Sequence, residues 1–574
     1  MRAVREKKEE YQEEISVFLR RLSHFLVDTF RLVEQQTNET MEHARSAMTN
    51  SLGNKTYEES RYHLWIHSAL LLFVREVNSY EWKTLIGQYV NIKNAYQEQF
   101  REHAMALKKT ARKQTGEEAE VLFTTAEKEK IDESVTSRSL TMKRKKTSKL
   151  VAGARNPLDQ KQDGKLDGFE VFGKVLNEQT KIMAEEQNYI VALFHLSSQS
   201  HSDFADVVTT NRSPTQRRMP DLGKMLSYEP DREIAKIIQQ AMESMYSFWP
   251  ADLHSLVDWT LSTDPLQGIG ILRSIELCSV TYEETNQEYI TGILRNIHER
   301  ISGLFHRFVE TQLTAIEETK VKISKRKGII SFMRTFPAFS AVVESMLPAE
   351  AGHESLEVRF IVNEAYGKIN KAMWESLTFI AKEPSQGGAA GGIADPEDKE
   401  ALNYHILLIE NANHYLEEVE THSNVILEEW KERAQHEFHT HCSHYVEAVI
   451  RRPLGKWLEF LESTETLLKS NEASPTNVAS KPSHSRSSAK KLLAQFDLKE
   501  VRKGVETLKK RIEKHFGDAD EPTLSNGLIE HVFHESSSRY GAAHDRMQAI
   551  IDAVYDGELK IDWRKDEVAV LFKR

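Results

Sequence analysis

The chain has 574 residues, more than one hydrophobic core usually organises, so several bundles or domains are expected. Its 87 acidic residues outnumber the 76 basic ones and give a net charge of −11, which argues against a general nucleic-acid binder. The two cysteines, Cys278 and Cys442, are too few for a disulfide framework and suit a reducing cytosol. Sparse glycine and proline favour long helices.

No segment of the sequence approaches the ~18 apolar residues of a membrane span; "ALLLFV" at 69–74 is typical of its longest aliphatic stretches. The first residues, "MRAVREKKEEYQEE", lack the apolar core of a signal peptide. We therefore expect a soluble, cytoplasmic protein with at most peripheral membrane contact.

Residues 1–107 are predicted to form an N-terminal helical bundle. Two apolar-periodic segments, 62–80 and 85–107, follow a first helix. That first helix carries apolar residues at spacings of three, four and seven, close to a heptad repeat: Ile15, Phe18, Leu22, Phe25 and Leu32. Such stripes can be buried only against each other or against a neighbour.

Residues 108–165 have few clustered apolar side chains and are predicted to be a disordered basic and polar linker. Its most basic run supplies the candidates for binding an acidic surface, Lys143, Arg144, Lys145 and Lys146. Such a run could touch anionic lipid or act in nuclear import. No apolar anchor lies beside it, so a solubilising linker is the favoured interpretation.

Helical periodicity returns in a middle bundle, 166–350, and in C-terminal bundles, 351–574, with flexible loops near 384–394 and 471–489. Gly328 is expected to end a long helix that begins near Tyr282. The longest predicted helix starts with Asp395 as N-cap and meets no breaker before Pro453, a length of ~85 Å at 1.5 Å per residue. Strand alternation and hairpin signals are absent. The sequence therefore predicts an all-α fold, an elongated rod of stacked antiparallel helical bundles.

The densest candidate for metal binding is "HEFHTHCSH" at 436–444. On a helix, Phe438, Cys442, Tyr445 and Val449 share one face, which is predicted to be buried. The remaining arc holds the histidines His436, His439, His441 and His444, which diverge and lack the His-x-x-x-His spacing of zinc proteases. A solvated polar face with no metal is the favoured interpretation, and adventitious zinc is the alternative. A weaker hypothesis gives these histidines a pH-dependent effect on a partner interface.

The stretch 159–170, "DQKQDGKLDGFE", resembles a calcium loop with Asp159, Asp163 and Glu170 at ligand positions. Lys161 occupies another ligand position, so an acidic loop leading into a helix is favoured. In "LNYHILLIENANHYLEEV", an apolar stripe is predicted to contain one polar residue, Asn413, that fixes helix register. No phosphate-binding loop, dinucleotide fingerprint or nucleophile elbow occurs, so neither an enzyme nor a cofactor is expected.

Three segments carry a family resemblance: "FPAFSAVVESML" (336–347), "VRFIVNEAYGKINKAMWESL" (358–377) and "DPEDKEALNYHILLIENANHYLEEV" (395–419). They resemble the C-terminal region of the exocyst subunit Sec-three, or exocyst complex component one, in its fungal type. The resemblance implies a rod of helical bundles without catalytic residues. It also implies that other exocyst subunits are partners, with small GTPases or SNAREs contacted indirectly. The expected place is the plasma membrane at sites of polarised secretion, where secretory vesicles are tethered.

Two parts of the full family pattern have no counterpart in these residues. One is an N-terminal PH-like module that binds phosphoinositides and Rho-type GTPases; the other is a long N-terminal coil that pairs with partner subunits. We therefore expect the C-terminal rod alone. Two other hypotheses stand beside this scaffold: an all-helical exchange factor for a small GTPase, and a peripheral membrane binder that uses the basic runs.

Overall fold

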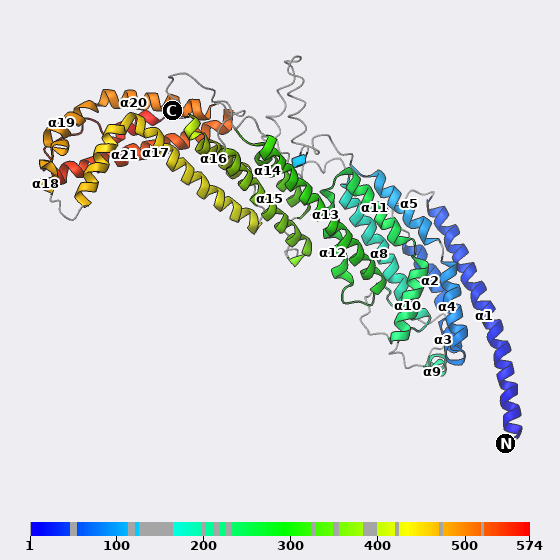
Figure 1. Ribbon diagram of the computed structural model, residues 1–574. Helices are drawn as coiled ribbons and strands as arrows, with labels where there is room; N and C mark the ends of the chain where they lie inside the picture. Colours follow the sequence, from blue (N-terminus) through cyan, green and yellow to red (C-terminus); the bar gives the residue numbers. More distant parts are fainter. Residues whose placement is uncertain are drawn as a thin grey trace, which may run out of the picture. The chain divides into compact units, whose positions relative to one another are not determined.

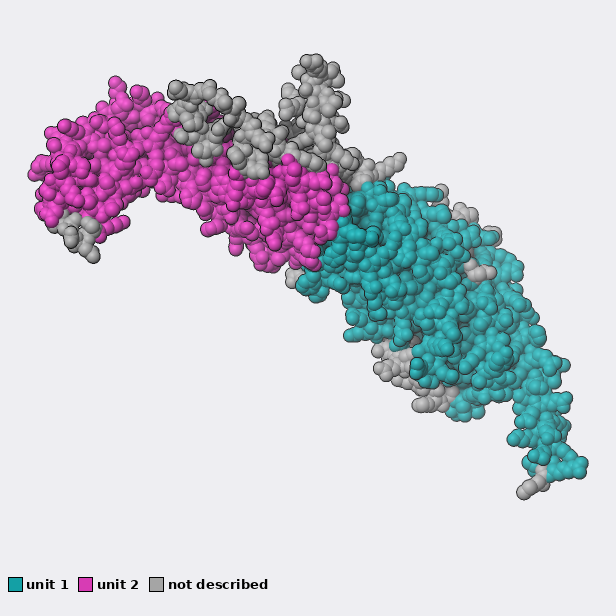
Figure 2. Space-filling model, viewed as in Figure 1, with its two compact units in different colours: residues 1–115, 155–308, 346–362 teal, residues 116–154, 309–345, 363–574 magenta. Residues whose placement is uncertain are grey.

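A computed structural model describes residues 2–45, 54–93, 95–112, 121–124, 165–197, 203–210, 218–223, 231–322, 328–347, 355–382, 399–419, 424–469, 475–517 and 522–573. Two compact units, drawn in different colours in Figure 2, divide the chain. Unit 1 comprises residues 1–115, 155–308 and 346–362, and unit 2 comprises 116–154, 309–345 and 363–574. Regular structure in the described ranges is helical apart from one isolated bridge between Ala111 and Leu166, so the all-α class is confirmed.

Unit 1 is built around α8, a largely buried helix that contacts α2, α5, α10, α11 and α12. Its helices, coloured blue to green in Figure 1, are α1 (Arg2–Arg45), α2 (Asn54–Trp65), α3 (Ser68–Val77), α4 (Ser79–Ile92), α5 (Tyr96–Lys109), α8 (Gly168–Leu193), α9 (Phe204–Thr210), α10 (Arg232–Met245), α11 (Trp249–Thr263), α12 (Gln267–Tyr282) and the first part of α13 (Glu288–Lys322). The segments 1–107 and 166–308, which were predicted to lie in separate bundles, therefore share one core, because α8 fills its centre.

Unit 2 has α16 and α17 as its central helices and also contains the end of α13, from residue 309 onward. The elements are α14 (Ser331–Met346), most of α15 (Glu357–Lys382), α16 (Lys399–Glu418), α17 (Val425–Lys469), α18 (Pro475–Ser480), the 3₁₀ turn η5 (Pro482–His484), α19 (Arg486–Gln495), α20 (Leu498–Phe516), α21 (Pro522–Val554) and α22 (Lys565–Phe572). Gly328, between α13 and α14, has φ +74, a conformation that suits glycine. The described part of α13 ends at Lys322, so Gly328 as the residue that ends this helix stays a prediction.

The single helix predicted from Asp395 to Pro453 is wrong. The chain instead forms two helices, α16 and α17, which lie side by side (Figure 1). Asn424 supplies the physical reason, because its side-chain oxygen accepts the backbone N–H groups of Ile426 and Leu427 at 3.0 and 3.2 Å and caps a new helix. Pro453 does not end α17, which continues to Lys469.

The flexible loop predicted near 471–489 is wrong for most of its length. Residues 475–480 form α18, 482–484 form η5, and α19 begins at Arg486. Val478 is fully buried, and His484 stacks on Phe460 with ring centroids 5.3 Å apart. Because this segment is mostly polar, its composition did not reveal that these few side chains are buried and hold it in place. The other predicted loop, 384–394, lies outside the described residues.

Short described pieces of the predicted linker 108–165 take part in packing. Arg112 donates its backbone N–H to the carbonyl of Leu166 at 2.8 Å. Phe123 is 3% exposed, contacts Phe339 at 5.6 Å between ring centroids, and donates its N–H to the Gln312 side chain at 3.0 Å. The basic run Lys143–Lys146 lies outside the described residues.

Candidate functional site

A buried ion-pair network lies at the centre of unit 1. Arg61 on α2 is 2% exposed and donates to Glu186 Oε2 on α8 through Nε and Nη2, at 3.2 and 3.0 Å. Its Nη1 donates to Glu185 Oε2 at 3.2 Å, and Tyr189 donates its hydroxyl to the Arg61 carbonyl at 2.8 Å. Buried charge is tolerated only when paired in this way, so the network fixes how α2 meets α8.

Two tyrosines from other helices complete the shell around Glu186. Tyr89 on α4 and Tyr96 on α5 donate their hydroxyls to its carboxylate at 2.6 and 3.0 Å. Burial alone would raise the pKa of Glu186. Attraction to Arg61 and Lys93, with the hydrogen bonds from Tyr89 and Arg61, instead lowers that pKa below its ordinary 4.5. Four helices therefore meet on one carboxylate that is ionised at neutral pH.

This network was not among the sites predicted from the sequence, although the sequence carries a signal for it. Arg61 falls at helical spacing between Tyr57 and Leu64, and Glu186 falls between Ile182 and Ile190. A charge within each apolar stripe indicates a buried partner. Because Arg61 and Glu186 are closed off from solvent, this arrangement holds helices in register and does not present a reactive group to a substrate.

A histidine cluster joins α16 to α17 in unit 2. His405 on α16 and His441 on α17 approach each other through their Nδ1 atoms at 2.9 Å, and His444 lies one turn further along α17. One nitrogen from each of the three rings lies within 4.8 Å of the others. Burial, and then the nearby His441 and His444, lower the pKa of His405 to about 4. Burial also lowers the pKa of His441.

The predicted helical faces of 436–444 are confirmed on the apolar side, where Phe438, Cys442, Tyr445 and Val449 are all buried. The outward placement of the histidines is wrong for His441, which is 8% exposed. The reason is that α16 folds back and covers His441 with His405 and Tyr404, whose ring lies 5.3 Å from that of His441. His436, His439 and His444 are exposed, as predicted.

Both cysteines are buried in ordinary packing. Burial raises the pKa of Cys278 to about 11 and that of Cys442 to about 12, so neither thiol is a ready nucleophile at neutral pH.

The calcium-loop candidate is described only at its end, since Asp159 and Asp163 lie outside the described residues. There, Glu170 accepts the backbone N–H of Asp167 at 2.9 Å at the start of α8. Arg112 donates to the Asp167 carboxylate at 3.1 Å. These two carboxylates therefore support a helix start, in agreement with the favoured interpretation of an acidic segment leading into a helix.

The buried asparagine of α16 is Asn411, not the predicted Asn413. Asn411 is fully buried, accepts the N–H of Ile330 at 2.8 Å and donates to the carbonyl of Gly328 at 3.1 Å. Asn413 is only partly buried. The Asn411 side chain thus hydrogen-bonds to the backbone just before α14. This pairing depends on a segment that is distant from Asn411 in the sequence.

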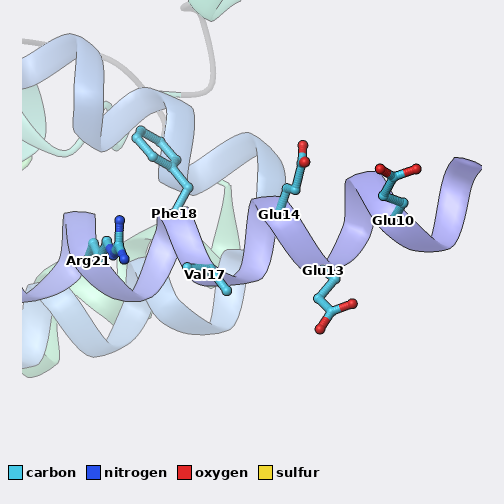
Figure 3. Close-up of a pocket in the computed structure, with 6 residues that line it drawn as sticks. All are labelled: Glu10, Glu13, Glu14, Val17, Phe18 and Arg21. Atoms are coloured by element: carbon cyan, nitrogen blue, oxygen red, sulfur yellow. The ribbon is translucent and has the colours of Figure 1, made fainter.

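The start of α1 carries an apolar seam that unit 1 covers only in part: the rings of Phe18 and Phe25 lie 5.7 and 5.4 Å from those of Phe73 and His67, and the rest of the seam faces solvent. Five residues at seven-residue intervals are between 49% and 74% exposed: Val4, Tyr11, Phe18, Phe25 and Leu32. The bundle-facing side of the same helix is formed by other residues, among them Leu19, Leu26 and Val33. The shallow hollow beside Phe18, lined by side chains of α1 alone, is an open surface and no enclosed pocket (Figure 3).

None of the helices described here is long and apolar enough to cross a membrane.

Comparison with known proteins identifies the family of the chain. Residues 193–557 match the family model "Exocyst complex component Sec3, C-terminal". The chain belongs to this family. Exocyst complex component 1 of Mus musculus is 20% identical over 392 residues, which cover 68% of this chain and 40% of that protein. Exocyst complex component SEC3A of Arabidopsis thaliana is 19% identical, over 59% of this chain and 35% of its own length.

This member of the Sec3 C-terminal family therefore spans about 40% of the length of the first curated relatives that it matches. Among solved structures, S. cerevisiae Exo70 aligns over 98% of both chains with 11% identity and a TM-score of 0.38, a likeness too weak to support a conclusion about function. The family resemblance seen in the sequence is thus confirmed, whereas its fungal type stays a prediction.

Proposed function

We propose that this chain is a structural subunit of an exocyst complex and holds secretory vesicles at the plasma membrane before SNARE-mediated fusion. The match of residues 193–557 to the Sec3 C-terminal family carries this proposal. Its relatives are named as exocyst components, which makes other exocyst subunits the expected partners. In this role the chain is a scaffold without enzymatic activity, and it works peripherally at the cytoplasmic side of the membrane.

The exposed seam of α1 is the surface best suited to a partner subunit. Its seven-residue repeat is the pattern by which one helix packs along another in a coiled coil. Beside the seam, exposed residues of alternating charge also recur every seven positions: Lys7, Glu14, Arg21 and Asp28. Figure 3 shows Glu14 and Phe18 on the same side of α1. The proposed occupant of the seam is an amphipathic helix of another subunit. Its apolar stripe would pack along the seam, and its charges would be opposite in sign to the charges of α1 that they face.

Association with the remaining exocyst subunits of the same organism tests the function. The purified chain should co-elute with them in size-exclusion chromatography, and failure to associate with any of them would overturn the proposal. Small-angle scattering of the chain alone checks the elongated rod that the sequence predicts, which a compact globule would contradict.

A double variant tests the role of the seam directly. Phe18→Glu with Phe25→Glu places two charges on the exposed stripe and should lower partner affinity at least ~10-fold, because each charge would be buried without a partner. Helical content should stay unchanged, since both side chains are already about half exposed. The matched control, Glu13→Gln with Arg20→Gln, lies elsewhere on α1 and should bind normally. Equal binding by both double variants would move the interface away from the seam.

Neither rival hypothesis gains support from a specific observation. No described feature favours a GTPase exchange factor. The basic run Lys143–Lys146 remains a proposed site for anionic lipid. Salt-sensitive liposome binding that is lost when these four residues are changed to glutamine would support it, and binding that survives the change would contradict it.

A further inference from the structure

The three clustered imidazoles have the composition and spacing of a metal centre. Zinc is held by histidine nitrogens at about 2.0–2.1 Å in a tetrahedron, which places neighbouring nitrogens about 3.4 Å apart. The facing nitrogens of His405 and His441 are 2.9 Å apart, and all three ligand atoms lie within 4.8 Å of one another. We propose that His405, His441 and His444 bind one zinc ion, with water in the fourth position.

The ring movements that this centre needs are small. The pair His405–His441 must open by about 0.5 Å, and no other separation must close by more than about 1.4 Å to reach tetrahedral spacing. His444 is exposed, so its side chain can rotate toward the other two without disturbing the core. His441 is held in place by its burial and by its neighbours on α16.

Glu437 gives an independent indication of metal binding. Its carboxylate Oε2 lies 3.3 Å from His441 Nε2, one turn earlier on α17. An Nε2–H donated to this carboxylate leaves the lone pair of His441 on Nδ1, the atom that faces His405. A carboxylate that orients a histidine through the nitrogen opposite the metal is the usual outer shell of a zinc site. The arrangement aims the His441 lone pair at the proposed ion.

The donor set selects the class of ion. Three imidazoles suit zinc and neighbouring transition metals, whereas calcium and magnesium require oxygen ligands. Zinc would link α16 to α17, which makes the ion a clip within unit 2.

Zinc titration of the full chain tests the site. Protein stripped with a chelator is titrated with Zn²⁺ against a chromophoric chelator, and separately with Co²⁺, whose visible absorption reports tetrahedral coordination. We expect one ion per chain and a zinc-dependent rise in Tm. His405→Gln and His444→Gln should each lower the affinity at least ~10-fold, and Glu437→Gln should lower it about 10–100-fold, as outer-shell changes do.

Exposed histidines of the same helix are the matched controls: His436→Gln and His439→Gln should leave zinc affinity and the Co²⁺ spectrum unchanged. His444→Gln keeps the test valid if the more buried variants unfold, because His444 lies on the surface. Binding that survives His444→Gln and His405→Gln would overturn the proposal. So would an adventitious ion only, seen as binding confined to millimolar zinc.

Discussion

Replacing Arg61 by methionine should destabilise unit 1 by about 3–5 kcal/mol at pH 7, the cost of breaking a buried pair. The structure gives a second route to this number. Without Arg61, the fully buried Glu186 keeps the hydroxyls of Tyr89 and Tyr96 but must stay ionised unpaired or become protonated. Protonating a carboxyl with an ordinary pKa of 4.5 at pH 7 costs about 3.4 kcal/mol.

The same reasoning predicts a pH dependence. At pH 5, protonation of Glu186 costs only about 0.7 kcal/mol, so the penalty of Arg61→Met should shrink by up to about 2.7 kcal/mol. The wild-type chain does not lose the pair at pH 5. Because the folded pKa of Glu186 is lowered, its contribution is present above pH 4.5 and is lost only as the pH falls through the folded pKa.

Hydrogen exchange of peptides from α8, corrected for the intrinsic rate at each pH, measures this stability, with α21 in unit 2 as an internal reference. The comparison variant is Arg300→Met, also in unit 1, because the Arg300 side chain is 36% exposed and its pair with Asp258 at 2.6 Å should be worth at most about 1 kcal/mol. An Arg61→Met loss as small as that of Arg300→Met, or equal at pH 5 and pH 7, would refute the reasoning.

Two further perturbations follow from buried polar contacts. The His298 ring lies 2.7 Å from Glu276, whose hydrogen bond raises the pKa of His298 above 6.5. This stabilisation is complete below pH 6.5 and lost as the pH rises through the folded pKa. Exchange of α13, corrected for the intrinsic rate at each pH, should therefore accelerate at alkaline pH in the wild type but not in His298→Asn. Asn411→Ala leaves the Ile330 N–H and the Gly328 carbonyl unpaired and should cost about 2–4 kcal/mol in urea unfolding. Asn413→Ala is its control and should cost under about 0.5 kcal/mol.

Features that depend on one helix alone could be predicted well from the sequence. Helical spacing placed Phe438, Cys442 and Tyr445 on one buried face, and the structure agrees, because 100° per residue holds wherever the helix lies. Contacts between helices could not be predicted in this way. In one helix from 395 to 453, His405 and His441 would lie about 54 Å apart, yet the turn capped by Asn424 brings them together.

The first helix shows a second limit of periodicity. Phe18 and Leu22 belong to the same predicted stripe, but Leu22 is buried and Phe18 is half exposed. The pattern identifies side chains that need a partner and does not say whether the partner is in the same chain. Here the bundle buries the neighbouring face, with Leu19, Leu26 and Val33, and leaves the seven-residue repeat at least about half exposed.

The chain thus departs from the usual placement of polar and apolar residues in two opposite ways. It buries the charges of Arg61 and Glu186 at a point where several helices of one unit pack together in a fixed register. It exposes Phe18, Phe25 and Leu32 along one line of α1. Unit 1 covers this line only in part, through Phe73 and His67, and a regular line of exposed rings and aliphatic groups is a liability in water. Within a helical scaffold, the simplest structure that covers such a line is a second helix of the same repeat, and the proposed partner subunit would supply it.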